Sequence, residues 1–240
     1  MGIIRTAVTA GLWGVTGGVA SVGAGMAYLA AGTTLVDLTK NDPWFKTKTY
    51  TKYNPKANPA LIDDCIKRVP LRKIRPDLRD NEEALTLEFC RGVWSRWGYW
   101  AQSKLQERYD APPGTEHHTW KTSELAVAKY EEGFKFSNHF EVVEHAGNEV
   151  AVRCGGSPLN PGLRNSDGLV LISARIDREK QEAVFSLKSA LFDSAGTFAE
   201  GADHKVPPKI TFLHRCLTTS RRLADMALQL VCGPGSINSM

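Results

Sequence analysis

The chain has 240 residues, of which 42% are hydrophobic and 23% are charged, and its formal net charge is +4. This composition supplies enough apolar side chains for a folded core, which excludes an intrinsically disordered chain. The length suits one domain plus an appendage. The sequence has neither zinc-finger spacing nor an aromatic RNA-binding signature, so we expect no nucleic-acid partner.

Residues 1–40 are predicted to form an apolar membrane anchor. No charged residue occurs from Thr6 to Val36, and this span (6–36) exceeds the roughly 20 residues that cross a bilayer as a helix. Small residues at positions such as Gly14 and Gly18 would let two such helices approach closely, which predicts a homodimer. The alternatives are a segment packed on the domain or on a partner, and a targeting peptide.

Residues 41–80 are predicted to form a linker. Its X-Pro pairs disfavour helix up to residue 59, and a short helix is expected over Ala60–Arg68. Basic residues gather in Lys67–Arg79, which favours a cytoplasmic location for the following domain, next to anionic lipid heads. A solvated connector is the alternative for this basic run.

The cysteines are scattered and include no CxxC pair, so we expect neither a disulfide framework nor a metal site. This pattern fits a reducing compartment. Cys90 and Cys216 are predicted to be small core residues on helices.

Residues 81–240 are predicted to form the ligand-binding domain, which opens with a helix over Glu82–Tyr109 capped by Asn81. Its apolar and aromatic side chains recur at helical spacing. They form either a core-facing stripe or one wall of a pocket for an apolar ligand. The predicted pocket combines aromatic residues of this helix with three from later strands: Trp94, Trp97, Tyr99, Phe136, Phe140 and Phe192.

A turn-rich connection follows over Asp110–His118, and then a short helix over Ser123–Tyr130. After Gly133 the periodicity changes to two, which predicts antiparallel strands. These strands cover residues 134–140, 150–154, 169–176 and 183–192, with a hairpin turn at 177–180. A final helix is expected over Ile210–Cys232.

The predicted fold class is therefore α+β, in which a long C-terminal helix covers a curved antiparallel sheet. A helix-grip (START-like) fold needs this arrangement and keeps a cavity between sheet and helix. A cystatin-like fold and a hotdog fold use the same elements and stay as alternatives.

Short stretches within Leu125–Gln229 resemble the DUF1990 (UPF0548) family of uncharacterised proteins. These stretches are Phe140–Val143, Val150–Gly155, Ser166–Leu169, Ala183–Ser189 and Arg221–Leu223. The chain also resembles small fungal proteins of unknown activity encoded near natural-product enzymes. That resemblance implies a small-molecule role and supplies no catalytic residues.

The sequence has no Walker A loop, GxGxxG, GxSxG or HExxH motif, so we expect any catalysis to need no cofactor. Arg153 and Asp167 stand at the two ends of a polar loop, which is either functional or a structural loop held by Arg–Asp pairing. Lys188 lies on the same strand face as Phe192, so it lines the interior if that face points inward. If the other face, with Phe185, Leu187 and Leu191, points inward, Lys188 is solvated.

Two histidines complete the predicted catalytic set. His139 shares a strand face with Glu141, which suits acid/base work or an outward polar pair. His214 lies on the final helix. The predicted catalytic residues are thus His139, Lys188, Arg153, Asp167 and His214.

Together these features predict a cofactor-free cyclase or isomerase of secondary metabolism, for example a Diels–Alder pericyclase, acting at the membrane on a hydrophobic polyketide or terpenoid. The alternatives are a non-catalytic lipid or sterol carrier, a hotdog thioesterase and a structural scaffold at a membrane.

Overall fold

The computed structural model describes residues 33–36, 41–109, 111–197 and 231–232. The chain divides into two units, Met1–Gly32 and Thr33–Met240, and every described residue belongs to the second unit. No helix within the described ranges is long and apolar enough to span a membrane.

The strands form one antiparallel sheet in the order β1-β2-β7-β6-β5-β4-β3. They are β1 (Thr33–Val36), β2 (Ala60–Pro70), β3 (Lys135–Phe136), β4 (Phe140–Ala146), β5 (Glu149–Gly155), β6 (Asp167–Asp177) and β7 (Glu182–Phe192). The helices are η1 (Pro43–Lys46), α2 (Lys48–Tyr53), η2 (Leu71–Lys73), η3 (Pro76–Leu78), α3 (Glu82–Ser95), α4 (Trp97–Tyr109) and α5 (Thr122–Leu125).

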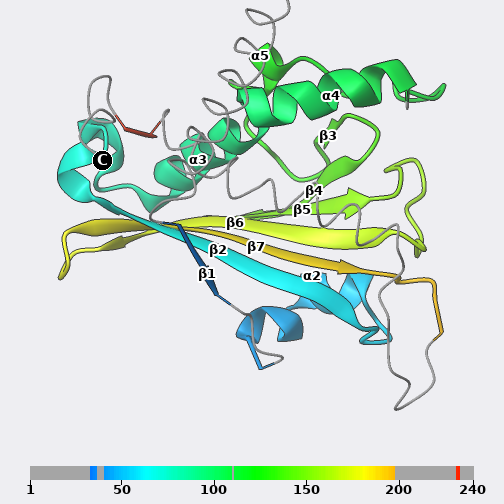
Figure 1. Cartoon of the computed structure of the whole chain (residues 1–240), viewed down its shortest axis with the longest axis horizontal. Helices are drawn as coiled ribbons and strands as arrows, with labels where there is room; N and C mark the ends of the chain where they lie inside the picture. The colour runs from blue at the N-terminus through cyan, green and yellow to red at the C-terminus, as the bar shows by residue number, and fades with distance from the viewer. Residues whose placement is uncertain (1–32, 37–40, 110, 198–230, 233–240) are drawn as a thin grey trace, which may run out of the picture. The chain divides into compact units, whose positions relative to one another are not determined.

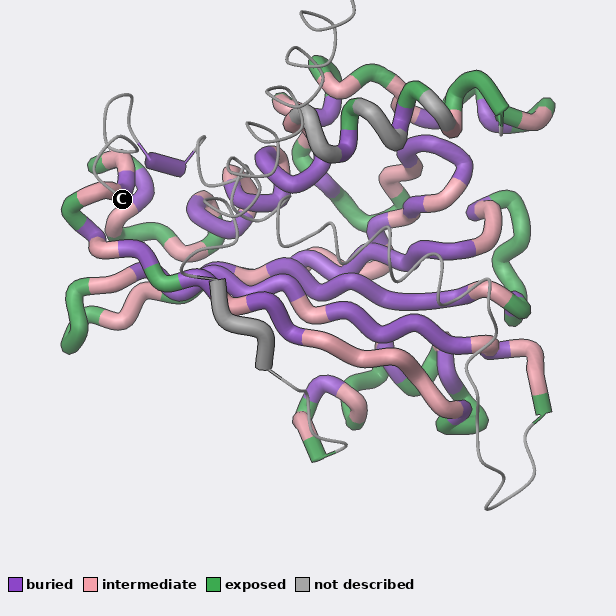
Figure 2. Tube along the Cα trace, viewed as in Figure 1, coloured by how far each residue is buried: buried purple, intermediate pink, exposed green. Residues whose placement is uncertain are grey.

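Helices lie on both sides of the curved sheet, with α3, α4 and α5 on one side and η1 and α2 on the other (Figure 1). The main core lies between the sheet and α3 and includes Leu85, Phe89, Val93, Val152, Ile172, Phe185 and Leu187. A second, smaller core lies on the opposite face and contains Trp44, Tyr50, Ala151, Leu169, Leu171, Ala190 and Phe192. Figure 2 shows the resulting run of buried residues along the central strands. The sheet is therefore buried on both faces.

Polar side chains of α3 fix its position on the sheet. Asn81 caps the helix by accepting a hydrogen bond from the Ala84 N–H at 2.9 Å, as predicted. The β5–β6 ladder ends at Ser173, so the next β6 amides need other acceptors. Thr86 Oγ1 accepts from the Ala174 N–H at 2.9 Å, and Glu82 Oε1 accepts from the Ile176 N–H at 2.6 Å. The first turns of α3 thus complete the edge of the ladder.

Three expected elements near the start of the domain differ in the structure. The region predicted as loop up to residue 59 contains η1 and α2, because the Asp42 and Thr47 side chains cap both. The predicted helix over Ala60–Arg68 is wrong, since β2 pairs with β7 along its whole length. The helix over Glu82–Tyr109 is interrupted at Arg96, which has an extended backbone.

The predicted strands from residue 150 onward are confirmed as β5, β6 and β7, each extended by a few residues. The expected strand over 134–140 is split, because Ser137 adopts a positive φ of 50° and turns the chain between β3 and β4. The helix expected over Ser123–Tyr130 is shorter and ends at Leu125.

Two predicted segments reach the edges of the described ranges. The anchor prediction extends too far, because Thr33–Val36 forms β1 and pairs with β2. The final helix lies outside the described residues except at its end, where Val231 is helical and buried in the main core. The Val231 carbonyl accepts a hydrogen bond from the Arg75 N–H at 2.9 Å, and the backbones of Cys232 and Ile74 form an isolated antiparallel β-bridge.

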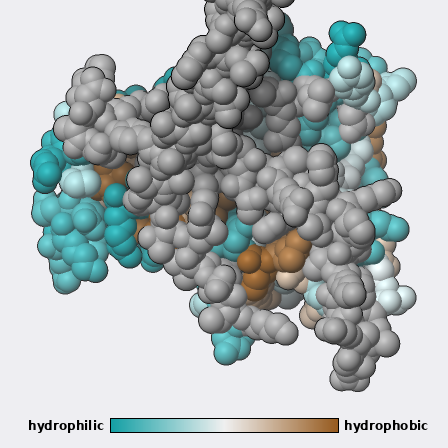
Figure 3. All heavy atoms as spheres, in the orientation of Figure 1, coloured by the Kyte–Doolittle hydropathy of each residue, from teal (hydrophilic) through white to brown (hydrophobic). Residues whose placement is uncertain are grey.

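One end of the sheet is strongly hydrophilic. Figure 3 shows hydrophilic atoms gathered where the β6–β7 turn lies with η2 and η3. The turn residues Arg178, Glu179 and Lys180 are all exposed. The candidate residues described below lie away from this turn.

Candidate functional site

Four of the six predicted pocket residues come together in the main core. We call Trp94, Tyr99, Phe136 and Phe140 the aromatic cluster; α3, α4, β3 and β4 contribute one ring each. The Trp94 ring centroid lies 4.8 Å from that of Phe140, 5.1 Å from that of Phe136 and 5.3 Å from that of Tyr99. All four side chains are buried. The rings therefore pack on one another, as the core-facing alternative predicts, and still form one continuous aromatic surface.

A polar edge, which we define as Tyr99, Ser137 and His118, borders the aromatic cluster. The Tyr99 and Ser137 hydroxyl oxygens lie 2.5 Å apart, and both are buried. Burial raises the pKa of Tyr99, against the opposing effect of the Ser137 hydrogen bond. Tyr99 therefore remains a protonated hydroxyl at neutral pH.

His118 presents a free ring nitrogen. Its Nδ1 lies 2.6 Å from the Ser137 carbonyl oxygen, which can only accept, so in the neutral ring Nδ1 carries the hydrogen and Nε2 the lone pair. His118 Nε2 is buried, and no described residue forms a hydrogen bond with it. Burial lowers the pKa of His118, and the neighbouring His117 and Lys135 lower it further, against the opposing Ser137 hydrogen bond and Glu141. His118 is therefore a neutral base at neutral pH.

The aromatic cluster also contains a donor that is only weakly satisfied. The indole N–H of Trp94 is buried and has only the weakly accepting Cys90 thiol beside it. Burial raises the pKa of Cys90, whose predicted role as a small core residue is confirmed. A donor and a basic acceptor with unused hydrogen-bonding capacity therefore lie in the aromatic cluster and its polar edge.

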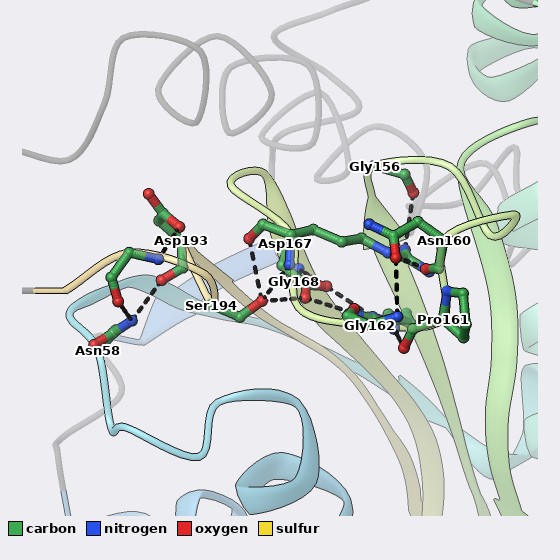
Figure 4. A network of polar contacts seen from close by, with 12 residues as sticks. Asn58, Gly156, Asn160, Pro161, Gly162, Asp167, Gly168, Asp193 and Ser194 are labelled. Carbon is green, nitrogen blue, oxygen red and sulfur yellow. Dashed lines mark hydrogen bonds and ion pairs between the residues drawn. The ribbon is translucent and has the colours of Figure 1, made fainter.

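Arg153 and Asp167 form a buried ion pair on the other face of the sheet (Figure 4). Arg153 Nε donates to Asp167 Oδ1 at 2.8 Å, and Arg153 Nη2 donates to Asp167 Oδ2 at 2.6 Å. The Ser194 hydroxyl donates to the same carboxylate at 2.6 Å, and the Arg153 guanidinium lies 4.4 Å from the centre of the Tyr53 ring. Arg153 also donates to the carbonyls of Pro161 and Gly162. The pair thus holds the loop between β5 and β6, as the Arg–Asp alternative predicts.

Lys188 lies on the face of the second core. The inward set of β7 in the main core is Phe185, Leu187 and Leu191, as the second alternative predicts. Lys188 is only partly exposed, however, and its ammonium donates to Asp42 Oδ2 at 2.9 Å. Phe192 shares its face and packs against Tyr50, with ring centroids 5.8 Å apart. The structure therefore separates Lys188 and Phe192 from the aromatic cluster.

Asp64 lies directly across the strands from Lys188, and Ser186 donates to its Oδ1 at 2.7 Å. Burial raises the pKa of Asp64, and the nearby Asp42 and Asp63 raise it too, against the effects of Ser186 and Lys188.

The two remaining catalytic candidates are placed as follows. His139 Nδ1 donates to the Gly155 carbonyl at 2.7 Å, and the Glu141 carboxylate lies 3.7 Å from the Lys135 ammonium. His214 lies outside the described residues, as does the side chain of Trp97. Within the described ranges, no three His, Cys, Asp or Glu side chains gather in a way that could hold a metal ion.

Sequence reasoning did not single out His118 or Asp64 as site residues. His118 follows a loop whose course no periodicity reveals, and Asp64 falls in the segment mistaken for a helix. Arg164 lies in the polar loop between Arg153 and Asp167, but which of the two arginines pairs with Asp167 depends on the fold.

Comparisons with protein-family models, with curated proteins and with solved structures give no match for this chain.

Proposed function

We propose that this domain binds a hydrophobic polyketide or terpenoid at the aromatic cluster and catalyses its cyclisation or isomerisation without a cofactor. Two buried atoms support this: Trp94 Nε1, which has only the weakly accepting Cys90 thiol beside it, and His118 Nε2, which has no hydrogen-bond partner among the described residues. A buried polar group without a partner costs about 1–3 kcal/mol, so such groups need an explanation. A ligand with a polar group would supply both partners.

The chemistry follows from the two kinds of polar group. A substrate carbonyl would accept hydrogen bonds from the Trp94 N–H or the Tyr99 O–H, which would polarise it as a pericyclic addition requires. In an isomerisation, His118 Nε2 would take a proton from the carbon beside the carbonyl and return it to another carbon. The same donors would stabilise the enolate oxygen formed between these two steps.

We propose the helix-grip arrangement as the finer fold. Support comes from the curved antiparallel sheet, one face of which is covered by α3, α4 and α5, and from the burial of Val231, where the predicted final helix ends. The cystatin-like and hotdog folds, and with the latter the thioesterase activity, stay predictions.

We also propose that the uncharged N-terminal segment before β1 attaches the protein to a membrane as a homodimer, with the domain facing the cytoplasm. The absence of charged residues from Thr6 to Val36 supports this attachment. Carbonate extraction of host membranes would test it: release of the full chain into the soluble fraction would contradict membrane insertion.

The test of the function is organic extraction and native mass spectrometry of the full chain purified from its host in mild detergent. We expect a stoichiometric apolar compound, and its absence would contradict the ligand site. Incubation of the protein with that compound and its acyclic precursors then tests turnover. Binding without turnover would establish the carrier alternative. Lys188, Arg153 and Asp167 lie away from the aromatic cluster, which favours a carrier over a reaction that uses those three residues.

A further inference from the structure

The loop between β5 and β6 buries two arginines and one carboxylate. Arg153 takes both oxygens of Asp167, as described above. Arg164, which is 4% exposed, donates only to backbone carbonyls, from Nε to Asn160 at 2.9 Å and from Nη1 to Gly156 at 2.8 Å. Figure 4 shows how Gly156 and Asn160 lie around this part of the network. No described residue forms an ion pair with Arg164.

Arg164 Nη2 is buried and has no hydrogen-bond partner among the residues that the structure describes. A guanidinium Nη2 carries two N–H donors, so both are unused. Burial lowers the pKa of Arg164, Arg153 lowers it further, and Asp167 and Glu141 attract the charge without bonding to it. A buried cation with unused donors is costly unless an anion completes it.

The surroundings of Arg164 add an apolar component. Residues 159–163, which precede Arg164 in the loop, are all exposed. Within this stretch Leu159 and Leu163 are 45% and 40% exposed, although leucine is normally buried. An acid with an apolar tail would contact both the cation and these leucines.

We infer that Arg164 is the anchor of a binding site for an amphiphilic oxyanion, in which the acidic head accepts from Arg164 Nη2 and the apolar tail covers Leu159 and Leu163. The head is a carboxylate or a phosphate, the groups whose geometry matches a guanidinium. This site is independent of the proposed function, because none of its residues belongs to the aromatic cluster.

Isothermal titration of the full chain with octanoate, acetate and inorganic phosphate, at constant ionic strength set with chloride, tests this site. We expect one saturable octanoate site per chain, with affinity roughly tenfold or more above that of acetate because the tail buries methylene groups. If phosphate binds more tightly than acetate, the head of the ligand is a phosphate. Binding to vesicles that contain phosphatidic acid would then distinguish a lipid ligand from a free phosphate ester. Wild-type protein that binds none of the three probes would overturn the site.

Two variants locate the binding. Arg164→Lys keeps the charge but loses the forked donors, so we expect roughly tenfold weaker octanoate binding, whereas the control Arg178→Lys at an exposed turn leaves it unchanged. Leu163→Ser, at an exposed position that folding tolerates, should weaken octanoate and leave acetate unchanged. Octanoate that binds Arg164→Lys as tightly as wild type, but fails to bind Trp94→Phe, would place it at the aromatic cluster and overturn the arginine site.

Discussion

Strand β5 buries different chemistry on its two sides. Toward α3 it presents Val150, Val152 and Cys154, all members of the main core. Toward η1 and α2 it presents Ala151 and the buried Arg153. Across the sheet both faces carry aromatic rings, but the opposite face also collects Asp64, Lys188 and Asp167.

This difference shows how each face is stabilised. The α3 face gains free energy mainly from apolar burial, and its buried polar groups include the hydrogen-bonded Thr86 and the Tyr99–Ser137 pair. The opposite face tolerates charge because each carboxylate there has a hydrogen-bonding partner. The proposed ligand site therefore relies on the shape of the α3 face, whereas the opposite face buries charge.

Removal of the central carboxylate should have the largest effect on stability. Asp167→Ala leaves Arg153 buried without its anionic partner and removes a charge that attracts Arg164, so we expect a loss of about 3–5 kcal/mol in the free energy of unfolding. Urea denaturation followed by circular dichroism measures it. A loss below about 1 kcal/mol would show that the ion pair is not what holds this face together.

A polar change on the α3 face should cost less. Thr86→Val keeps the shape of the side chain but removes the acceptor of the buried Ala174 N–H, so we expect a loss of about 1–3 kcal/mol. Hydrogen exchange at Ala174 should accelerate at the same time. Unchanged exchange would mean that Thr86 does not connect α3 to β6.

The pH dependence of stability sharpens the contrast further. In the folded chain the pKa of Asp64 is raised above its ordinary value of 3.8. Between the ordinary pKa and the raised pKa, the folded chain therefore binds more protons than the unfolded chain. Wild-type stability therefore falls as pH rises through this window. Asp64→Asn should remove that loss. The stability gained by the variant over wild type should grow from pH 3.8 upward and then level off. A gain largest at acid pH would contradict the shift; Asp80→Asn, at an exposed position, is the control.

The smallest effect is expected at the solvated end of the sheet. The Arg178–Asp80 ion pair, at 3.0 Å, has both side chains mostly exposed. Arg178→Met should change the free energy of unfolding by less than about 0.5 kcal/mol. A larger loss would mean that exposed charge also contributes to this fold.

The sequence predicted the β5–β6–β7 meander and its inward face well, because alternation of apolar residues registers burial on one side of a strand. It failed at β2, where residues with mixed spacing become a strand only by pairing with β7 from the far end of the domain. The aromatic cluster was predicted in part: its four residues were all named for the pocket, whereas the exclusion of Phe192 required knowledge of the strand face on which it lies.

The polar site residues were harder to predict. Arg153 and Asp167 were named as a pair because they stand at the two ends of one loop. His118 could not be linked to Ser137, since that contact joins a loop to a turn with no common periodicity. The separation of Lys188 from the aromatic cluster became clear only when both faces of the sheet were seen to be covered.

The most direct test of the ligand site compares one change on each face. Wild type, Trp94→Phe and Phe192→Leu would be titrated with the apolar compound recovered from the host-purified protein, and the ligand-induced rise in Tm measured. We predict that Phe192→Leu keeps the rise and that Trp94→Phe, which loses the indole N–H but keeps a ring, reduces it strongly. A rise that is unchanged in Trp94→Phe and lost in Phe192→Leu would move the ligand to the opposite face and contradict the proposed site.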